Sequence, residues 1–320
     1  MRSFFGYLVS ITLLALCILL IMYIFIPSHV GQSKYLSPLP DFLTVGVNKQ
    51  VTLLDFWSPI VEKFQAEASP PTFTARAVLL YNLSTNKSMY SYQSSKRLPM
   101  ASLTKIMTAI VALENKRHDD RYVVRAENLV GEDSMGVLPG EIFSLEELLY
   151  GLMLPSGNDA AEVIASNYVG GRKAFIDAMN DKVKAMGLDD THFSNPSGLQ
   201  GDGQQYTTAL DLLVITKYAL DNFPVFRKIV STYEHTLPAT GTHQSYTLYN
   251  ETNLLTTYPG VKGVKTGYTP EAGMCLITLL EYKGHSIVGI LLNSENRREE
   301  MKHFLDFSLL SLKITPPSHQ

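Results

Sequence analysis

The chain has 320 residues, of which 45% are hydrophobic and 18% charged, as in a folded protein of one large or two small domains. Its formal net charge of −3 argues against nucleic acid or an acidic polymer as a partner. The two cysteines are far apart in the sequence and the eight histidines lack metal-ligand spacing, so neither a disulfide nor a metal centre is expected.

The first predicted element is an apolar segment near the N-terminus. Residues 4–26 contain no charged residue and are long enough to cross a bilayer as a helix. Arg2 precedes the run, which favours a cytoplasmic N-terminus. Because the run is longer than a usual signal-peptide core and no Ala-x-Ala site follows, we expect residues 1–26 to be an uncleaved membrane anchor. A cleaved signal peptide is the alternative, and both place the remaining chain on the extracytoplasmic side.

A linker rich in Pro, Ser and Gly is predicted over residues 27–70, with a short helix over 52–66, and the folded domain over residues 71–312. Strands are expected over 75–81 and 88–92. Helices then begin near residues 102, 144, 158, 172 and 207, several of them with capping residues. Four further strands over 246–248, 261–267, 275–282 and 286–292 precede a last helix over 295–307. This order predicts an α+β fold with one sheet built from both ends of the domain and a helical lobe inserted between them.

A Ser-x-x-Lys pair opens the helix predicted after Pro99. Residues three apart share a helix face, so the amine of Lys105 can lie beside the hydroxyl of Ser102. Lysine can take a serine proton if burial or positive neighbours lower its pKa. The pair alone is a weak signal, because about one Ser-x-x-Lys is expected by chance in a chain of this length. A second one, Ser84 to Lys87, falls in a predicted hairpin turn.

Two further motifs could complete a site. Ser156 and Asn158 lie in the turn between two predicted helices, where a hydroxyl can relay a proton and an amide can hold a peptide bond; a helix N-cap is the alternative interpretation. The triplet Lys265-Thr266-Gly267 ends a predicted strand, where lysine can hold a carboxylate and glycine permits close approach. A charged strand end followed by a turn is the alternative there.

These motifs occur in the order known for serine penicillin-recognising enzymes. Residues 99–108, 151–161 and 263–273, which carry them, resemble the serine-type D-alanyl-D-alanine carboxypeptidases, which are low-molecular-mass penicillin-binding proteins. Residues 195–199 and 207–212 are similar to the same family, and the resemblance covers about residues 72–310. It implies the fold of β-lactamases and DD-peptidases: an antiparallel sheet flanked by helices, an all-helical lobe, and a site between them.

The resemblance also implies the chemistry. Ser102 is expected to be the acylated nucleophile, Lys105 its base, and Ser156 the group that relays a proton toward the leaving D-alanine. The implied substrate is the pentapeptide stem of peptidoglycan, which loses its last D-alanine without help from a metal or cofactor. β-Lactam antibiotics are expected to acylate the same serine.

Substrate binding is assigned by the same resemblance to a second set of residues: Asn158, Lys265, Thr266, Gly267 and Tyr268. The asparagine is expected to hold the substrate amide, and the lysine and threonine its terminal carboxylate. The backbone N–H groups of the tyrosine and of the nucleophile would form the oxyanion hole.

Two departures from the common family pattern carry expectations. Tyr268 stands where a smaller residue is frequent, so its ring is expected to narrow the cleft. Lys262 stands where aspartate is frequent, so its charge is expected to lower the pKa of Lys265.

Three alternative functions use the same fold. A class A-like β-lactamase would need a glutamate for deacylation, and residues 189–201 contain no glutamate followed four residues later by asparagine, which predicts slow release of penicillin. A DD-endopeptidase would use the same residues and stays open. A non-catalytic penicillin-binding scaffold is the third alternative.

Overall fold

The computed structural model describes residues 57–60, 69–199 and 203–319. The membrane anchor predicted over residues 1–26 lies outside this part of the chain, as does most of the linker. Of the helix predicted over 52–66, only residues 57–60 are described, and they have no regular secondary structure. Among the described residues, no helix combines the length and the apolar character needed to span a bilayer.

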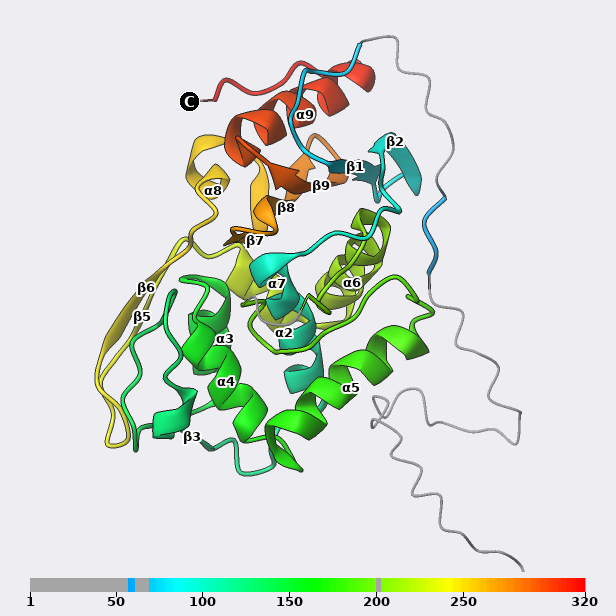
Figure 1. The fold of residues 1–320 in the computed structure, drawn as a ribbon. Coiled ribbons are helices and arrows are strands. Elements are labelled where there is room, and N and C mark those ends of the chain that lie inside the picture. The colour runs from blue at the N-terminus through cyan, green and yellow to red at the C-terminus, as the bar shows by residue number, and fades with distance from the viewer. Residues whose placement is uncertain (1–56, 61–68, 200–202, 320) are drawn as a thin grey trace, which may run out of the picture. The chain divides into compact units, whose positions relative to one another are not determined.

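A five-stranded antiparallel sheet organises the described domain, with the strand order β2-β1-β9-β8-β7 (Figure 1). Its strands are β1 (Ala77–Asn82), β2 (Lys87–Tyr92), β7 (Val261–Thr269), β8 (Gly273–Tyr282) and β9 (His285–Ser294). β1 pairs with β9 in a register that sets Ala77 opposite Leu292. The prediction of one sheet built from both ends of the domain is therefore confirmed. Residues 83–86 form the turn between β1 and β2, so the second Ser-x-x-Lys is a hairpin turn as predicted.

Alternate residues of each central strand point to opposite sides of the sheet. Both sides are buried, each in its own core. In β1, Leu79 belongs to a core shared with the helices of the lobe, whereas Leu80 belongs to a second core shared with α9 (Arg297–Ser311). α9 packs against β8 and β9, and α6 (Ala209–Asn222) packs against β1 and β9. The apolar runs of the central strands therefore reflect a sheet that is covered on both sides.

The remaining helices of the part that the structure describes are, in chain order, η2 (Ala101–Thr104), α2 (Lys105–Glu114), η3 (Ala126–Asn128), α3 (Leu145–Met153), α4 (Asn158–Ser166), α5 (Gly171–Ala185), α7 (Pro224–Val230) and α8 (Leu254–Thr257). Two predicted caps are confirmed. The Ser144 hydroxyl accepts a bond from the Glu147 N–H in a capping box, and the Thr208 hydroxyl accepts one from the Asp211 N–H.

The predicted cap of α4 is wrong. Gly157 is the N-cap residue and no side chain caps this helix. The side-chain oxygen of Asn158 bonds instead to the distant Lys105. The Asp159 carboxylate bonds mainly to the loop at residues 134–137, and it also accepts from the adjacent Ala160 N–H. The Lys105 amine and the row of donors in the loop are stronger partners for these side-chain oxygens than the N–H groups in the first turn of α4.

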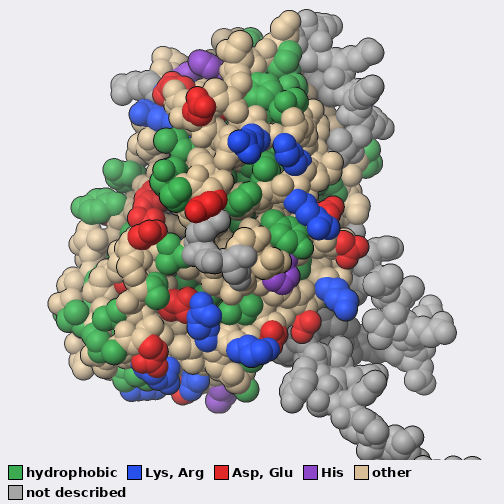
Figure 2. All heavy atoms as spheres, in the orientation of Figure 1, with side chains coloured by type: hydrophobic (Ala, Val, Ile, Leu, Met, Phe, Trp, Pro, Cys, Tyr) green, Lys and Arg blue, Asp and Glu red, His purple; other side chains and the backbone are tan. Residues whose placement is uncertain are grey.

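Two small ribbons belong to the lobe rather than to the main sheet: β3 (Tyr122–Val123) with β4 (Ile142–Phe143), and β5 (Glu234–Leu237) with β6 (Tyr246–Tyr249). The strand predicted over 246–248 exists, but it pairs with β5, which the sequence analysis missed along with α7. Figure 1 shows β5 and β6 as a long hairpin beside α3. On the face shown in Figure 2, acidic and basic side chains are interspersed, in keeping with the small net charge.

Candidate active site

Ser102 lies in a tight turn that precedes a helix. Residues 101–104 form the 3₁₀ turn η2, and the α-helix begins only at Lys105. Ala101 enters this turn with a φ of 48°, in the left-handed region that non-glycine residues rarely adopt. The predicted proximity is confirmed, since Lys105 Nζ lies 2.9 Å from Ser102 Oγ.

The amine of Lys105 is fully buried and has three partners. Besides Ser102 Oγ, it donates to Asn158 Oδ1 at 2.7 Å and to the Ser197 carbonyl oxygen at 2.7 Å. Burial, followed by the charge of Lys265, holds the pKa of Lys105 well below its ordinary value. A neutral amine keeps two N–H donors and one lone pair. The two carbonyl oxygens can take those two donors, which leaves the lone pair facing the Ser102 hydroxyl.

A cavity of about 700 Å³ opens at Ser102. Ser156 lines the same cavity, although only 1% of its surface is exposed, and its Oγ has no hydrogen-bond partner among the described residues. Its φ of 62° places this non-glycine residue in the left-handed region as well. Such a backbone costs about 1–3 kcal/mol and persists where the surrounding structure imposes it, often at functional sites.

The triplet on β7 brings a second buried lysine to the site. Lys265 is 1% exposed, and burial, with the nearby Arg297, lowers its pKa to about 8, although Glu251 acts in the opposite direction. The exposed Lys262 is not a cause of this shift, so the expectation that it lowers the pKa of Lys265 is wrong. Thr266 lines the cavity, and its hydroxyl donates to Glu251 Oε2 at 3.1 Å.

Gly267 allows β7 to approach the Ser102 turn. A Cβ at this position would lie 2.9 Å from the Ser102 nitrogen and 3.1 Å from the Ala101 Cβ, closer than side chains ordinarily tolerate. The next residue, Tyr268, lines the cavity with 60% of its surface exposed. It therefore lies at the opening of the cavity. That its ring narrows the cleft stays a prediction.

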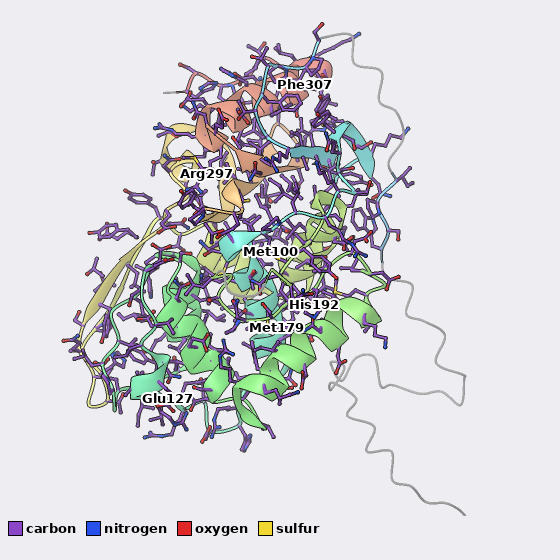
Figure 3. The ribbon with its side chains drawn as sticks, viewed as in Figure 1. Met100, Glu127, Met179, His192, Arg297 and Phe307 are labelled. Atoms are coloured by element: carbon purple, nitrogen blue, oxygen red, sulfur yellow. The ribbon has the colours of Figure 1, made fainter. Side chains whose placement is uncertain are left out.

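Arg297 is a cavity residue that the sequence analysis missed. It is the first residue of α9, and its guanidinium donates to the Gly267 carbonyl at 2.6 Å. Figure 3 labels Arg297 near the end of the sheet that faces Met100, which directly precedes the Ser102 turn. Burial lowers its pKa. No local pattern distinguished this arginine from Arg298 beside it.

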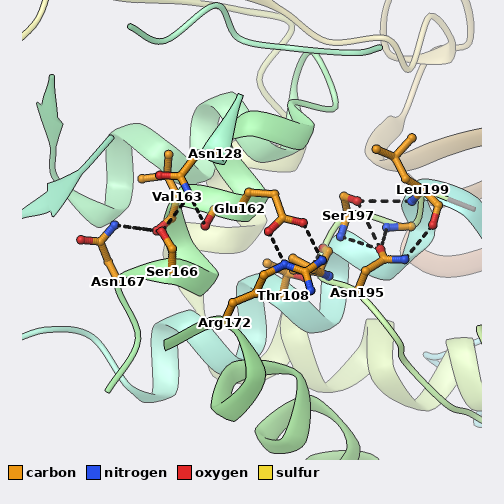
Figure 4. A network of polar contacts seen from close by, with 12 residues as sticks. Thr108, Asn128, Glu162, Val163, Ser166, Asn167, Arg172, Asn195, Ser197 and Leu199 are labelled. Carbon is orange, nitrogen blue, oxygen red and sulfur yellow. Dashed lines mark hydrogen bonds and ion pairs between the residues drawn. The ribbon is translucent and has the colours of Figure 1, made fainter. Parts of the chain in front are cut away.

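The loop at residues 195–199 supports the Ser102 turn from the other side. Asn195 Oδ1 accepts bonds from the Ser197 and Gly198 N–H groups, and Asn195 Nδ2 donates to the Leu199 carbonyl (Figure 4). The loop is tied to α2 through Thr108, which donates to the Pro196 carbonyl at 2.6 Å. Its Asn-Pro and Ser-Gly pairs are typical of a turn, but its residues were cited only for their family resemblance, and no role beside Lys105 was predicted for them.

Acidic residues of the cavity were also missed. Glu132, Asp133 and Glu251 all line it, and none belonged to a motif. Among the described residues, no group of three or more His, Cys, Asp or Glu is placed to hold a metal ion.

Comparisons with known proteins agree with this geometry. A family model of D-alanyl-D-alanine carboxypeptidases matches residues 64–296. The chain is 32% identical over 251 residues to the D-alanyl-D-alanine carboxypeptidase DacF of Bacillus subtilis, covering 76% of this chain and 64% of DacF, slightly under two thirds of that protein. It is 34% identical over 241 residues to a D-alanyl-D-alanine carboxypeptidase of Streptomyces sp. K15, covering 70% and 82%.

Two further similarities bear on function and fold. The chain is 32% identical over 250 residues to the D-alanyl-D-alanine endopeptidase of Escherichia coli, covering 76% of this chain and 78% of that one. The crystal structure of the Streptomyces K15 DD-transpeptidase superposes with a TM-score of 0.71 at 31% identity, covering 76% of this chain and all of that one. The α+β fold of the described domain is therefore the fold of the DD-peptidases.

Proposed function

Because the chain belongs to the D-alanyl-D-alanine carboxypeptidase family of serine peptidases, we propose that it removes the terminal D-alanine from peptidoglycan stem pentapeptides through an acyl-enzyme on Ser102. The observation that carries the proposal is the 2.9 Å contact between Lys105 Nζ and the Oγ of Ser102, which lines a cavity of about 700 Å³. A buried lysine with a lowered pKa, beside a serine that lines a cavity, is a means of activating that hydroxyl.

Acylation begins with proton transfer from Ser102 to Lys105. The lowered pKa of Lys105 favours the neutral amine, and in that form its bonds to Asn158 Oδ1 and the Ser197 carbonyl aim the lone pair at the hydroxyl. The serine oxygen then attacks the carbonyl carbon between the two terminal alanines. Ser156, whose Oγ is buried and unpartnered among the described residues, relays the proton to the leaving D-alanine amine as the C–N bond breaks. Water hydrolyses the ester and restores Ser102.

The substrate carboxylate is assigned to the cationic end of the cavity. Lys265 is buried and Arg297 is partly buried there, so their charges are screened less than charges on the open surface. Thr266 is proposed to add a hydrogen bond, for which its hydroxyl must leave Glu251.

The peptide itself is assigned to Asn158 and to the strand end. Asn158 Oδ1 accepts from Lys105, and Asn158 Nδ2 donates a long bond of 3.5 Å to the Gly131 carbonyl. The second N–H of that amide is the group left for a substrate carbonyl. Gly267 provides the close approach to β7. The backbone N–H groups of Ser102 and Tyr268 are proposed as the oxyanion hole.

The test is direct. The full chain is incubated with a pentapeptide ending in D-Ala-D-Ala, and free D-alanine is assayed with and without penicillin. We expect release that penicillin abolishes, and no release and no penicillin labelling in Ser102→Ala. Labelling that persists in that variant would refute the nucleophile assignment.

Endopeptidase action is a second candidate, because two similar proteins, from Escherichia coli and Pseudomonas aeruginosa, are named D-alanyl-D-alanine endopeptidases. The same serine would cleave the cross-link between two stem peptides. A cross-linked dimer offered beside the pentapeptide separates the two activities, since faster cleavage of the dimer would favour the endopeptidase.

We further propose that residues 4–26 anchor the enzyme in the cell membrane as a single span, with the peptidase domain on the extracytoplasmic side. The support is an uncharged apolar run of sufficient length behind Arg2. The full chain is then expected in the membrane fraction after high-salt washing, and a chain that starts near residue 30 in the soluble fraction. Equal partitioning of the two chains would refute the anchor.

A further inference from the structure

The cavity has two chemically different sides. Arg297 lines one end of the cavity, and the buried Lys265 and the carboxylate of Glu251 lie within range of one another's charges there. Glu132 and Asp133 line the cavity as well, and they are exposed carboxylates. Neither takes part in any ion pair between described residues. Asp133 acts through space on the charges of Lys105, Lys265 and Arg297, and Glu132 adds a second exposed carboxylate to the lining. Carboxylates beside a site that must bind a carboxylate weaken that binding, unless the substrate also carries a positive charge.

The loop that carries these acids is fixed in place. The Asp159 carboxylate accepts bonds from Ser134 Oγ at 2.5 Å and from the N–H groups of Met135 and Gly136 at 3.0 Å each. Just before this turn, the Asp133 carbonyl accepts a bond from the Asn158 N–H at 2.8 Å. The side chains of Glu132 and Asp133 are therefore presented at a defined place beside Asn158.

Two features favour this cavity as a ligand-binding site. Ser156 Oγ is buried at its wall without a partner among the described residues, which is costly unless a ligand supplies one. The cavity lining also continues along β7 from Thr266 to Pro270. A peptide that is held by its carboxylate at the cationic end and extends along this lining keeps its preceding residue inside the same cavity.

We propose that Glu132 and Asp133 are specificity-determining residues that bind a free side-chain ammonium on the substrate residue preceding the two terminal alanines. This inference rests on the proposed function and names its substrate class: stem peptides whose diamino acid is not yet acylated. An ammonium between two carboxylates forms charge-assisted hydrogen bonds, and a cross-linked or acylated amine has lost the charge that they recognise.

Two peptides test the proposal. Both end in Lys-D-Ala-D-Ala, and they differ only in that the lysine amine is free in one and acetylated in the other. The ratio of their kcat/KM values is measured by D-alanine release with the full chain. We expect a preference of about fivefold for the free amine, the size that two partly exposed ion pairs can supply. The preference should shrink at about 1 M salt, where the screening length is about 3 Å.

Variants then assign the preference to the loop. Glu132→Gln/Asp133→Asn is expected to bring the ratio close to one. Glu127→Gln, an exposed acid that Figure 3 shows well away from Arg297, should keep it. Because each ratio compares two peptides on the same enzyme, any effect of the substitutions on Lys105 or on folding cancels.

The outcomes are distinct. Equal cleavage of both peptides by the unaltered chain, or faster cleavage of the acetylated one, would overturn this inference and leave the carboxypeptidase assignment standing. A preference that survives in the double variant would also overturn it. Release of D-alanine from neither peptide would overturn the proposed function together with the inference.

Discussion

Replacing Gly198 with alanine tests how closely the Ser102 turn depends on a loop almost one hundred residues away in the sequence. Gly198 has a φ of 89°, and a Cβ there would lie 2.0 Å from the Ala101 carbonyl oxygen and 2.9 Å from the Ser102 nitrogen. Ordinary contact begins near 3.4 Å, so the loop or the turn must move by more than an ångström. The bond from Lys105 to the neighbouring Ser197 carbonyl would be disturbed at the same time.

Two costs follow, and a matched variant separates them. An alanine in the left-handed region costs about 1–2 kcal/mol of stability at either position. Gly187 has a φ of 71° with no atom within 4 Å of its added Cβ, so Gly187→Ala carries the strain without the clash. Only Gly198→Ala displaces the nucleophile, and a misplacement of about 1 Å can cost about 100-fold in rate.

The assay is the rate of acylation by a fluorescent penicillin, with the melting temperature measured in parallel. We expect both variants to melt a few degrees lower, and only Gly198→Ala to acylate about 100-fold more slowly. If Gly198→Ala acylated at the rate of Gly187→Ala, the view that this loop positions Ser102 and Lys105 would be refuted.

Three further predictions concern charge and stability. The pKa of Lys265 is lowered to about 8, so its charge is present below that pH and lost above it. KM for the peptide should therefore rise between about pH 7 and about pH 9. A constant KM would count against a role of Lys265 in carboxylate binding. Asp159→Ala strands the N–H donors of the loop at residues 134–137 and should cost about 3 kcal/mol in urea unfolding, which an unchanged midpoint would contradict. Lys182→Met leaves the Glu114 carboxylate buried without its cation, whose Nζ lies 2.5 Å from Glu114 Oε1 in the native chain. It should lower the free energy of unfolding by about 3 kcal/mol or more, while penicillin acylation keeps its rate. A slower acylation would show that this pair supports the site.

Features that depend on neighbours in the sequence were predictable. The pairing of β1 with β2, the capping box of α3 and the contact between Ser102 and Lys105 all join groups within a few residues of one another, where chain geometry leaves few choices. The apolar runs at both ends of the domain likewise predicted one sheet, because such strands are stable only when both faces are covered.

Features that depend on distant partners were not predictable from local pattern. Asn158 was expected to be a possible cap, but the Lys105 amine, 53 residues earlier, takes its oxygen. Arg297, Glu251 and Asp133 belong to no motif. They meet at the cavity only because α9, the loop between β6 and α8, and the loop before β4 converge there. The sequence by itself thus determined the chemical groups and the elements that carry them. Tertiary structure decided which of them share one cavity, because burial and charge act through space, and the order of residues does not record those distances.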